Sequence, residues 1–120
     1  MFPIIIRNSR VPRLFNCIGG KMFSIIIFPF IFIIKESDID DDEYTFKRVI
    51  NHEMIHYKQF IELFVIGFYL VYFYDFIKNL IIYKDILISY QNIRLEKEAY
   101  KYDNQMDYLE HRKHYQWLYI

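Results

Sequence analysis

The stretch Asn51-His52-Glu53-Met54-Ile55-His56-Tyr57 carries the pattern His-Glu-x-x-His. In a helix, residues four positions apart lie one above the other, with Cβ atoms roughly 5–6 Å apart, so His52 and His56 can bind one metal ion with two imidazoles. Glu53 leans to the side of that pair, where it can take a proton from a metal-activated water. Residues 44–64 contain no Gly or Pro, which favours a helix through the whole motif. The stretch therefore predicts a helical Zn2+ site with Glu53 as general base.

A tetrahedral zinc ion held by two histidines needs a third protein ligand, with water in the fourth position. Four downstream residues are candidates for that ligand: Glu96, Glu98, His111 and His114. Glu96 and Glu98 lie about 200° apart around a helix, so only one of them can face the metal. Glu96 shares its face with Ala99, Tyr100 and Asp103, and the small Ala99 lets two helices approach closely, whereas the face of Glu98 is more polar. We predict Glu96 as the third ligand, keep Glu98 as the alternative, and expect His111 and His114 to be solvated.

The chain has 120 residues and no net charge, which is enough for one domain and gives no basic field for nucleic-acid binding. Cys17 is the single cysteine, which excludes an internal disulfide and a zinc site built from cysteines, and fits a reducing compartment. The apolar run at residues 2–6 is too short for a secretory signal, and Arg7 interrupts it. We therefore expect a protein of the cytoplasm or of the cytoplasmic face of a membrane.

The N-terminal third is rich in β-branched and aromatic residues, which favours strands. Residues 2–6 predict a short strand, and residues 22–34 predict one long strand or two that bend at Pro29. An edge strand here is either where a peptide substrate adds to the sheet or part of a core hairpin with no partner. The acidic residues 36–42 indicate capping of the helix that follows.

The remaining sequence predicts a series of helices. Their expected bounds are 43–66 for the metal helix, 67–83 for an apolar helix, 93–103 for the third-ligand helix and 107–119 for the C-terminal helix, with a break at Gly67 and a connection at 84–92. The predicted fold class is α+β: a single domain, residues 1–120, in which a small N-terminal β-sheet from residues 1–35 packs on the HExxH helix, followed by two or three further helices.

Residues 63–83 are apolar on nearly all sides, and a domain of this length cannot easily bury them. We expect this segment to contact a membrane surface or a second copy in a homo-oligomer, in preference to forming a clean transmembrane span.

His52-Glu53-Met54-Ile55-His56, followed further along by Glu96-Lys97-Glu98-Ala99, resembles the gluzincin pattern of HExxH and then ExxA. Similar motifs occur in the membrane-bound CAAX-prenyl-protease-like peptidases and in the BlaR-type sensor peptidases. The resemblance covers residues 44–103 and implies a zincin-like fold, with zinc held by the two histidines and Glu96. Those peptidases place an Asp four residues after the ligand Glu, as partner of a ligand imidazole. Tyr100 occupies that place here, and its hydroxyl can accept from an imidazole N–H.

Together these features predict a zinc metallopeptidase that hydrolyses peptide bonds in a peptide or protein substrate. Four residues are candidates for stabilising the oxyanion: Tyr100, Tyr102, His111 and Arg112. The alternative is a non-catalytic, membrane-associated binding or structural protein that retains the fold and the zinc, and a third hypothesis is a zinc hydrolase with another substrate class. Retention of Glu53 favours the enzyme, because zinc binding alone does not require that carboxylate.

Overall fold

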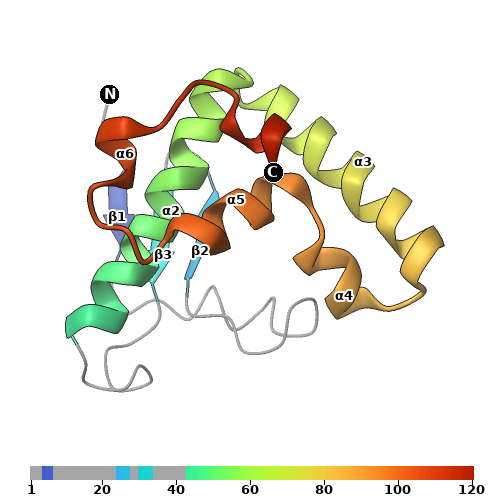
Figure 1. The fold of residues 1–120 in the computed structure, drawn as a ribbon, viewed down its shortest axis with the longest axis horizontal. Helices are drawn as coiled ribbons and strands as arrows, with labels where there is room; N and C mark the ends of the chain where they lie inside the picture. Colours follow the sequence, from blue (N-terminus) through green and yellow to red (C-terminus); the bar gives the residue numbers. More distant parts are fainter. Residues whose placement is uncertain (1–3, 7–23, 28–29, 34–42) are drawn as a thin grey trace.

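The computed structural model describes residues 4–6, 24–27, 30–33 and 43–120 (Figure 1). Its helices are α2 (Glu43–Glu62), α3 (Ile66–Tyr83), α4 (Ile86–Gln91), α5 (Arg94–Tyr102), α6 (Tyr108–His111) and the 3-10 helix η3 (Gln116–Tyr119). Its strands are β1 (Ile4–Ile6), β2 (Ser24–Ile27) and β3 (Phe30–Ile33), in the order β1-β3-β2, with β1 parallel and β2 antiparallel to β3. Cys17, Pro29 and the acidic residues 36–42, about which predictions were made, lie outside the described residues.

The predicted α+β class, with an N-terminal sheet as the layer under the motif helix, is corrected by the structure. Residues 43–120 are helical apart from their connections, and the hydrophobic side chains whose burial is described within them form clusters between helices. The motif helix α2 buries its apolar side chains against α3 and α5, so helix packs on helix around the candidate site. The prediction failed because β-branched runs were taken as evidence for a sheet layer, whereas the preference for strands depends strongly on packing context.

Two hydrophobic clusters hold α5 against α2. Ile55 of α2 packs with Ala99 and Tyr108 in one cluster. The other contains Phe60, Phe68, Tyr90, Ile93, Leu95 and Trp117. Because each cluster joins a residue of α2 to a residue of α5, the two clusters determine which face of α5 meets the motif helix.

The break after α2 lies at Phe64 and Val65, earlier than predicted. Their φ angles are positive, 56° and 64°, which is uncommon for any residue other than glycine and rarer still for a β-branched residue such as Val65. The Val65 N–H donates to Phe60 O at 2.8 Å and so satisfies a carbonyl of the last turn. Gly67 lies inside α3, where a Cβ would come within 3.2 Å of Leu63 Cβ. The glycine therefore permits a close approach of the chain to the end of α2, and it does not make the break.

Two further segments differ from the sequence-based expectation. The predicted connection at residues 84–92 contains α4, which begins after Asp85 because the Asp85 side chain accepts a hydrogen bond from the Ile88 N–H at 2.9 Å. The predicted helix at residues 107–119 is divided into α6 and η3, because Arg112 is extended and Tyr115 has a φ of 58°.

Candidate metal centre

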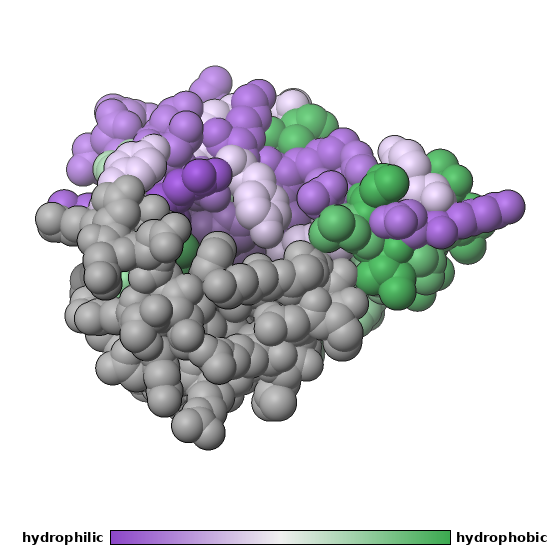
Figure 2. Space-filling view, turned by 90° about the horizontal axis from the view of Figure 1, so that it is seen from below, coloured by the Kyte–Doolittle hydropathy of each residue, from purple (hydrophilic) through white to green (hydrophobic). Residues whose placement is uncertain are grey.

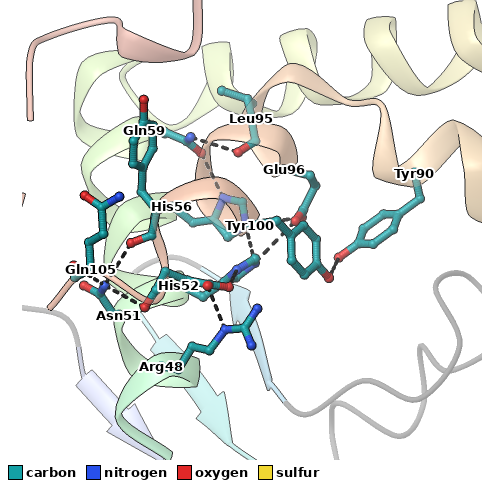
Figure 3. A network of polar contacts seen from close by, with 12 residues as sticks. Arg48, Asn51, His52, His56, Gln59, Tyr90, Leu95, Glu96, Tyr100 and Gln105 are labelled. Carbon is teal, nitrogen blue, oxygen red and sulfur yellow. Dashed lines mark hydrogen bonds and ion pairs between the residues drawn. The ribbon is translucent and has the colours of Figure 1, made fainter. Parts of the chain in front are cut away.

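Helix α2 presents His52 and His56 one turn apart on a single buried face, with their Nε2 atoms 3.2 Å from each other (Figure 3). This pairing follows from the spacing within one helix, since residues four apart are neighbours on its surface. A third ligand has to come from another part of the chain.

Glu96 of α5 completes a triangle of ligand atoms. Its Oε2 lies 3.3 Å from His52 Nε2, and its Oε1 lies 3.2 Å from His56 Nε2. Ala99, one turn further along α5, is fully buried in the cluster with Ile55 of α2. With only a methyl group at that position, α5 can approach α2 closely enough to bring the carboxylate to the histidines.

The triangle fits a zinc ion. Zinc–ligand bonds of about 2.0–2.1 Å at tetrahedral angles place the ligand atoms about 3.3 Å from one another. Here the two Nε2 atoms are 3.2 Å apart, and each of them has a different oxygen of Glu96 at 3.2–3.3 Å. Among the described residues, the buried Glu96 Oε2 has no hydrogen-bond partner, which costs free energy unless a cation or a proton lies in front of it. The described part of the chain contains no other cluster of this kind.

Asp103 orients the imidazole of His52. Its Oδ2 lies 3.2 Å from His52 Nδ1, and its Oδ1 accepts from Arg48 Nε at 2.8 Å. Because a carboxylate can only accept, Nδ1 of the neutral imidazole carries the hydrogen, and Nε2 presents its lone pair to the centre of the triangle. We expected Tyr100 in this role. Its ring instead contacts His52 edge-on, with centroids 4.5 Å apart, and its hydroxyl pairs with that of Tyr90 at 3.2 Å.

Gln59 orients the imidazole of His56 in the same way. The amide nitrogen of Gln59 donates to Leu95 O at 3.0 Å and to Glu98 Oε2 at 2.7 Å. These two acceptors determine which end of the amide is nitrogen, so the amide oxygen faces His56 Nδ1, at 2.8 Å. An amide oxygen only accepts, which leaves Nδ1 of His56 as the donor and turns the Nε2 lone pair toward Glu96 and His52, where it could bind a metal ion.

Glu98, the alternative ligand, belongs to a separate buried ion pair and is not part of the triangle. Its Oε1 accepts from Arg112 Nε at 2.8 Å, and the same guanidinium donates to Glu62 Oε1 at 2.6 Å. Glu98 is fully buried, contrary to the expectation of a solvated face. One arginine thus neutralises two buried carboxylates, and through Gln59 this ion pair is connected to His56.

Asn51, directly before the motif, connects α2 to the end of α5. Its Nδ2 donates to the main-chain oxygens of Asp103 at 2.9 Å and Gln105 at 3.0 Å. Carbonyl groups at a helix C-terminus have no partner within the helix. By binding them, Asn51 holds the segment with Asp103, and with it Glu96 of α5, against the motif helix.

Glu53, the predicted general base, is buried on α2 beside His52. Tyr72 approaches from α3 and donates its hydroxyl to Glu96 Oε1 at 2.9 Å. Burial, together with the negative charges of Glu96 and Glu53, raises the pKa of Tyr72 well above its usual value, so the hydroxyl stays protonated as a donor. Helices α2, α3 and α5 therefore each place a polar group at the centre.

The electrostatics of the centre favour a positive charge inside the triangle. Burial disfavours the imidazolium form of His52, but the carboxylates of Asp103 and Glu96 outweigh it and raise the pKa of His52 to about 10. For Glu96, burial is outweighed by His56 and His52, which lower the pKa of the carboxyl group. A proton is therefore held strongly where a divalent cation would bind, and the two compete for the same atoms.

The remaining candidates for a ligand or an oxyanion donor are exposed to solvent or make contacts with residues outside the triangle. The side chains of His111 and His114 are 73% and 90% exposed. The Tyr102 ring stacks on Tyr108, with centroids 4.1 Å apart. Of the residues considered for the oxyanion, Tyr100 is the one whose ring contacts a member of the His52–His56–Glu96 triangle.

Gln59 and Tyr72 were not among the residues predicted for the site, and the role of Asp103 was expected of Tyr100. Gln59 follows His56 by three positions on the same helix face, and Asp103 follows Glu96 by seven positions, at the residue that caps α5, so both had a local signal. Tyr72 had none, because its approach to Glu96 depends on how α3 returns toward α2 after the break at Phe64.

No protein-family model, curated protein or solved structure matches this chain. The assignment of a metal to His52, His56 and Glu96 therefore rests on the geometry and chemistry of these residues.

Proposed function

We propose that this chain is a zinc-dependent metallopeptidase, with the metal held by His52, His56 and Glu96. The carrying observation is the cluster of two Nε2 atoms, 3.2 Å apart, with a Glu96 carboxylate whose two oxygens each lie 3.2–3.3 Å from one of them, which are spacings that suit tetrahedral zinc. Three protein ligands leave one position for water, as in catalytic zinc sites, whereas structural sites use four protein ligands.

When bound, zinc would act as a Lewis acid toward the substrate carbonyl and lower the pKa of its water to about 7. Glu53 takes a proton from the water that attacks the carbonyl carbon. The same carboxyl group then gives the proton to the amide nitrogen as the C–N bond breaks, which yields a carboxylate and an amine. The burial of Glu53 next to His52 supports this role, because a solvated glutamate on the outer face of α2 could not reach the reacting water.

Tyr100 is the residue that we propose as hydrogen-bond donor to the developing oxyanion. Its ring lies against His52, its side chain is partly open to solvent, and its hydroxyl is held by Tyr90. Burial and the charge of Glu96 raise the pKa of Tyr100 to about 12, so it keeps its proton at neutral pH.

The test is the metal content of purified protein, measured by mass spectrometry of the elements, beside hydrolysis of a peptide library. We expect about one zinc per chain in the wild type and in Glu53→Gln, loss of zinc in Glu96→Ala, and a fall in hydrolysis of about 10²–10⁴-fold in Glu53→Gln. The exposed Glu110→Ala is the matched control and should retain both properties.

A wild type without zinc, or a Glu96→Ala variant that keeps it, would contradict the site. Zinc bound by His52, His56 and Glu96 with no hydrolysis of peptides would favour the non-catalytic binding protein instead.

A further inference from the structure

Helix α3 buries polar side chains and exposes apolar ones. Its buried residues are Phe68, Asp75 and Asn79, so two of its few strongly polar side chains face the protein. Asp75 accepts from Arg94 Nε and Nη2, both at 2.9 Å, and Asn79 Nδ2 donates to Ser89 O at 3.0 Å. The inner face is therefore fastened to α4 and α5 by hydrogen bonds along its length.

The outer face of α3 is apolar from one end to the other. Six residues on it are each more than half exposed: Ile66, Leu70, Phe73, Tyr74, Ile77 and Ile81. At 100° per residue they occupy a continuous arc of about 100°, which lies opposite the buried face. The helix meets the length and composition required of a membrane span, and three of its residues, Phe68, Asp75 and Asn79, are buried, so most of its surface is left uncovered by the described part of the chain.

The apolar surface continues onto α4. Ile86, Leu87 and Ile88 are each about half exposed, and Figure 2 shows hydrophobic residues gathered at the right of the view, where Figure 1 places α4 and the end of α3. The exposed charged residues of the α3–α4 segment are Lys78, Lys84 and Asp85, which leaves little net charge to attract an anionic partner.

We propose that the outer face of α3, extended by α4, is embedded in the interfacial layer of a lipid bilayer, with α3 lying parallel to the membrane plane. Protein interfaces carry about one hydrogen bond per 100–200 Å², whereas this face offers tyrosine hydroxyls and otherwise aliphatic and phenyl groups. Such a face gains by transfer into hydrocarbon and makes no demand for hydrogen-bond partners.

The parallel orientation follows from the charged residues that lie on the inner side of α3 and on the neighbouring α5. Asp75 and Arg94 bind each other on its inner side, and Lys97 and Lys101 are exposed on the neighbouring α5. A perpendicular α3 would carry these charges into the hydrocarbon, which is costly. In the parallel arrangement the charges stay in water, and Lys78 at the edge of the apolar arc can extend its ammonium group to the headgroups.

This orientation also locates the candidate metal centre. Tyr72 and Phe68, on the inner side of α3, contact Glu96 and His56. The centre therefore lies about one helix diameter, ~10 Å, from the apolar arc, and a substrate of the proposed peptidase would be cleaved beside the membrane surface. That last consequence rests on the proposed function, whereas membrane binding does not.

The test is flotation of the purified full chain with vesicles of uncharged phosphatidylcholine. We expect the wild type to float with the vesicles, and a variant that combines Leu70→Gln, Ile77→Gln and Ile81→Gln to partition into them on the order of 100-fold less. The matched control combines Met106→Gln and Leu118→Gln, whose residues are similarly exposed but lie outside α3 and α4, and it should float like the wild type.

Circular dichroism and zinc content should be unchanged in the triple variant, which separates membrane binding from the metal centre. A wild type that stays in the aqueous fraction would overturn the proposal. The same holds if the wild type forms a dimer that the triple variant cannot form, without binding vesicles, because a second copy would then cover the face.

The orientation is tested by nitroxide labels at Leu70, Ile77 and Ile81, one at a time, in a Cys17→Ser background. The parallel arrangement predicts the same depth in the bilayer for all three labels. A depth that changes along the helix, by up to about 16 Å between residues 70 and 81 at 1.5 Å per residue, would instead show a spanning helix and overturn the parallel arrangement.

Discussion

At the scale of single residues, the candidate centre depends on which nitrogen each histidine presents. Asp103 and Gln59 both offer acceptors to Nδ1, at 3.2 Å for His52 and 2.8 Å for His56. Both imidazoles therefore point Nε2 at Glu96, and no change of tautomer is needed on metal binding. Preorganisation of this kind raises affinity because the ordering is complete before the ligand arrives.

Asp103→Asn should lower zinc affinity by about 10–100-fold, because the amide binds the imidazole more weakly and its nitrogen can turn toward Nδ1. Competition with a chromogenic chelator measures the change. Tyr100→Phe is the control: its hydroxyl is bonded to Tyr90 and its ring contact with His52 remains, so its zinc affinity should equal that of the wild type. Equal losses in both variants would contradict the role of Asp103.

The stability of the metal-free protein should fall as the pH rises from 7 to 9. The folded-state pKa of His52, about 10, lies above its usual 6.5. The stabilising contribution of its proton is therefore complete below pH 6.5 and is lost as the pH rises through 10, at up to about 1.4 kcal/mol per pH unit. Chemical denaturation at each pH measures this change, in a range below the titration of the tyrosines.

Stoichiometric zinc should remove that dependence, because the metal displaces the proton from the triangle. Its binding should accordingly become tighter with rising pH over the same range. A metal-free protein whose unfolding free energy is constant between pH 7 and 9 would show that His52 is not protonated in the folded state.

At the scale of elements, helix ends in this chain include non-glycine residues with a left-handed backbone. Lys84 ends α3 with a φ of 54°, and its N–H donates to Leu80 O at 2.9 Å. The carbonyl is satisfied as in glycine-terminated helices, but a side chain at positive φ costs free energy because Cβ crowds the carbonyl oxygen.

Lys84→Gly should therefore raise the free energy of unfolding by about 0.5–1 kcal/mol, since the exposed Lys84 loses little packing and the strain is relieved. The same substitution inside a helix should act in the opposite direction. Lys58→Gly, at an exposed interior position of α2, should cost about 1 kcal/mol. Urea denaturation of both variants measures whether each substitution raises or lowers the free energy of unfolding. A loss of stability in Lys84→Gly would contradict the strain argument.

At the scale of the whole molecule, the C-terminal segment is joined to the motif helix α2 by one buried arginine. Arg112 bridges Glu62 at the end of α2 and Glu98 of α5, and all three side chains are at most 5% exposed. Glu98 in turn accepts from Gln59, which orients His56. Through Arg112, the last part of the chain thus contributes to the order of the candidate centre. The contact between Arg112 and Glu62 joins residues that are fifty positions apart in the sequence.

Arg112→Ala should lower the free energy of unfolding by about 3–5 kcal/mol, because it leaves two buried carboxylates without their cation. The neighbouring Lys113 is exposed, and Lys113→Ala should change stability by less than about 0.5 kcal/mol. Thermal and urea denaturation of the two variants measure both changes in the free energy of unfolding. A loss in Arg112→Ala as small as that in Lys113→Ala would contradict the role of this guanidinium.

The sequence by itself determined the histidine pair and the position of Glu53, because both depend on the period of a single helix. Face arguments also selected Glu96 over Glu98, through Ala99, which is buried in the cluster with Ile55. The fold class could not be inferred from the β-branched runs, because such runs carry no information on which layer packs against the motif helix, and that depends on context.

Only the tertiary structure decided how the parts come together. The contacts of His52 with Asp103, of Tyr72 with Glu96 and of Arg112 with Glu62 join residues on different elements. Local periodicity carries no information about such pairs, since they exist only after α5 and α3 have packed on α2. The physical reason is that a helix specifies its own faces within a few residues, whereas the partner of each face is selected by the packing of the whole chain.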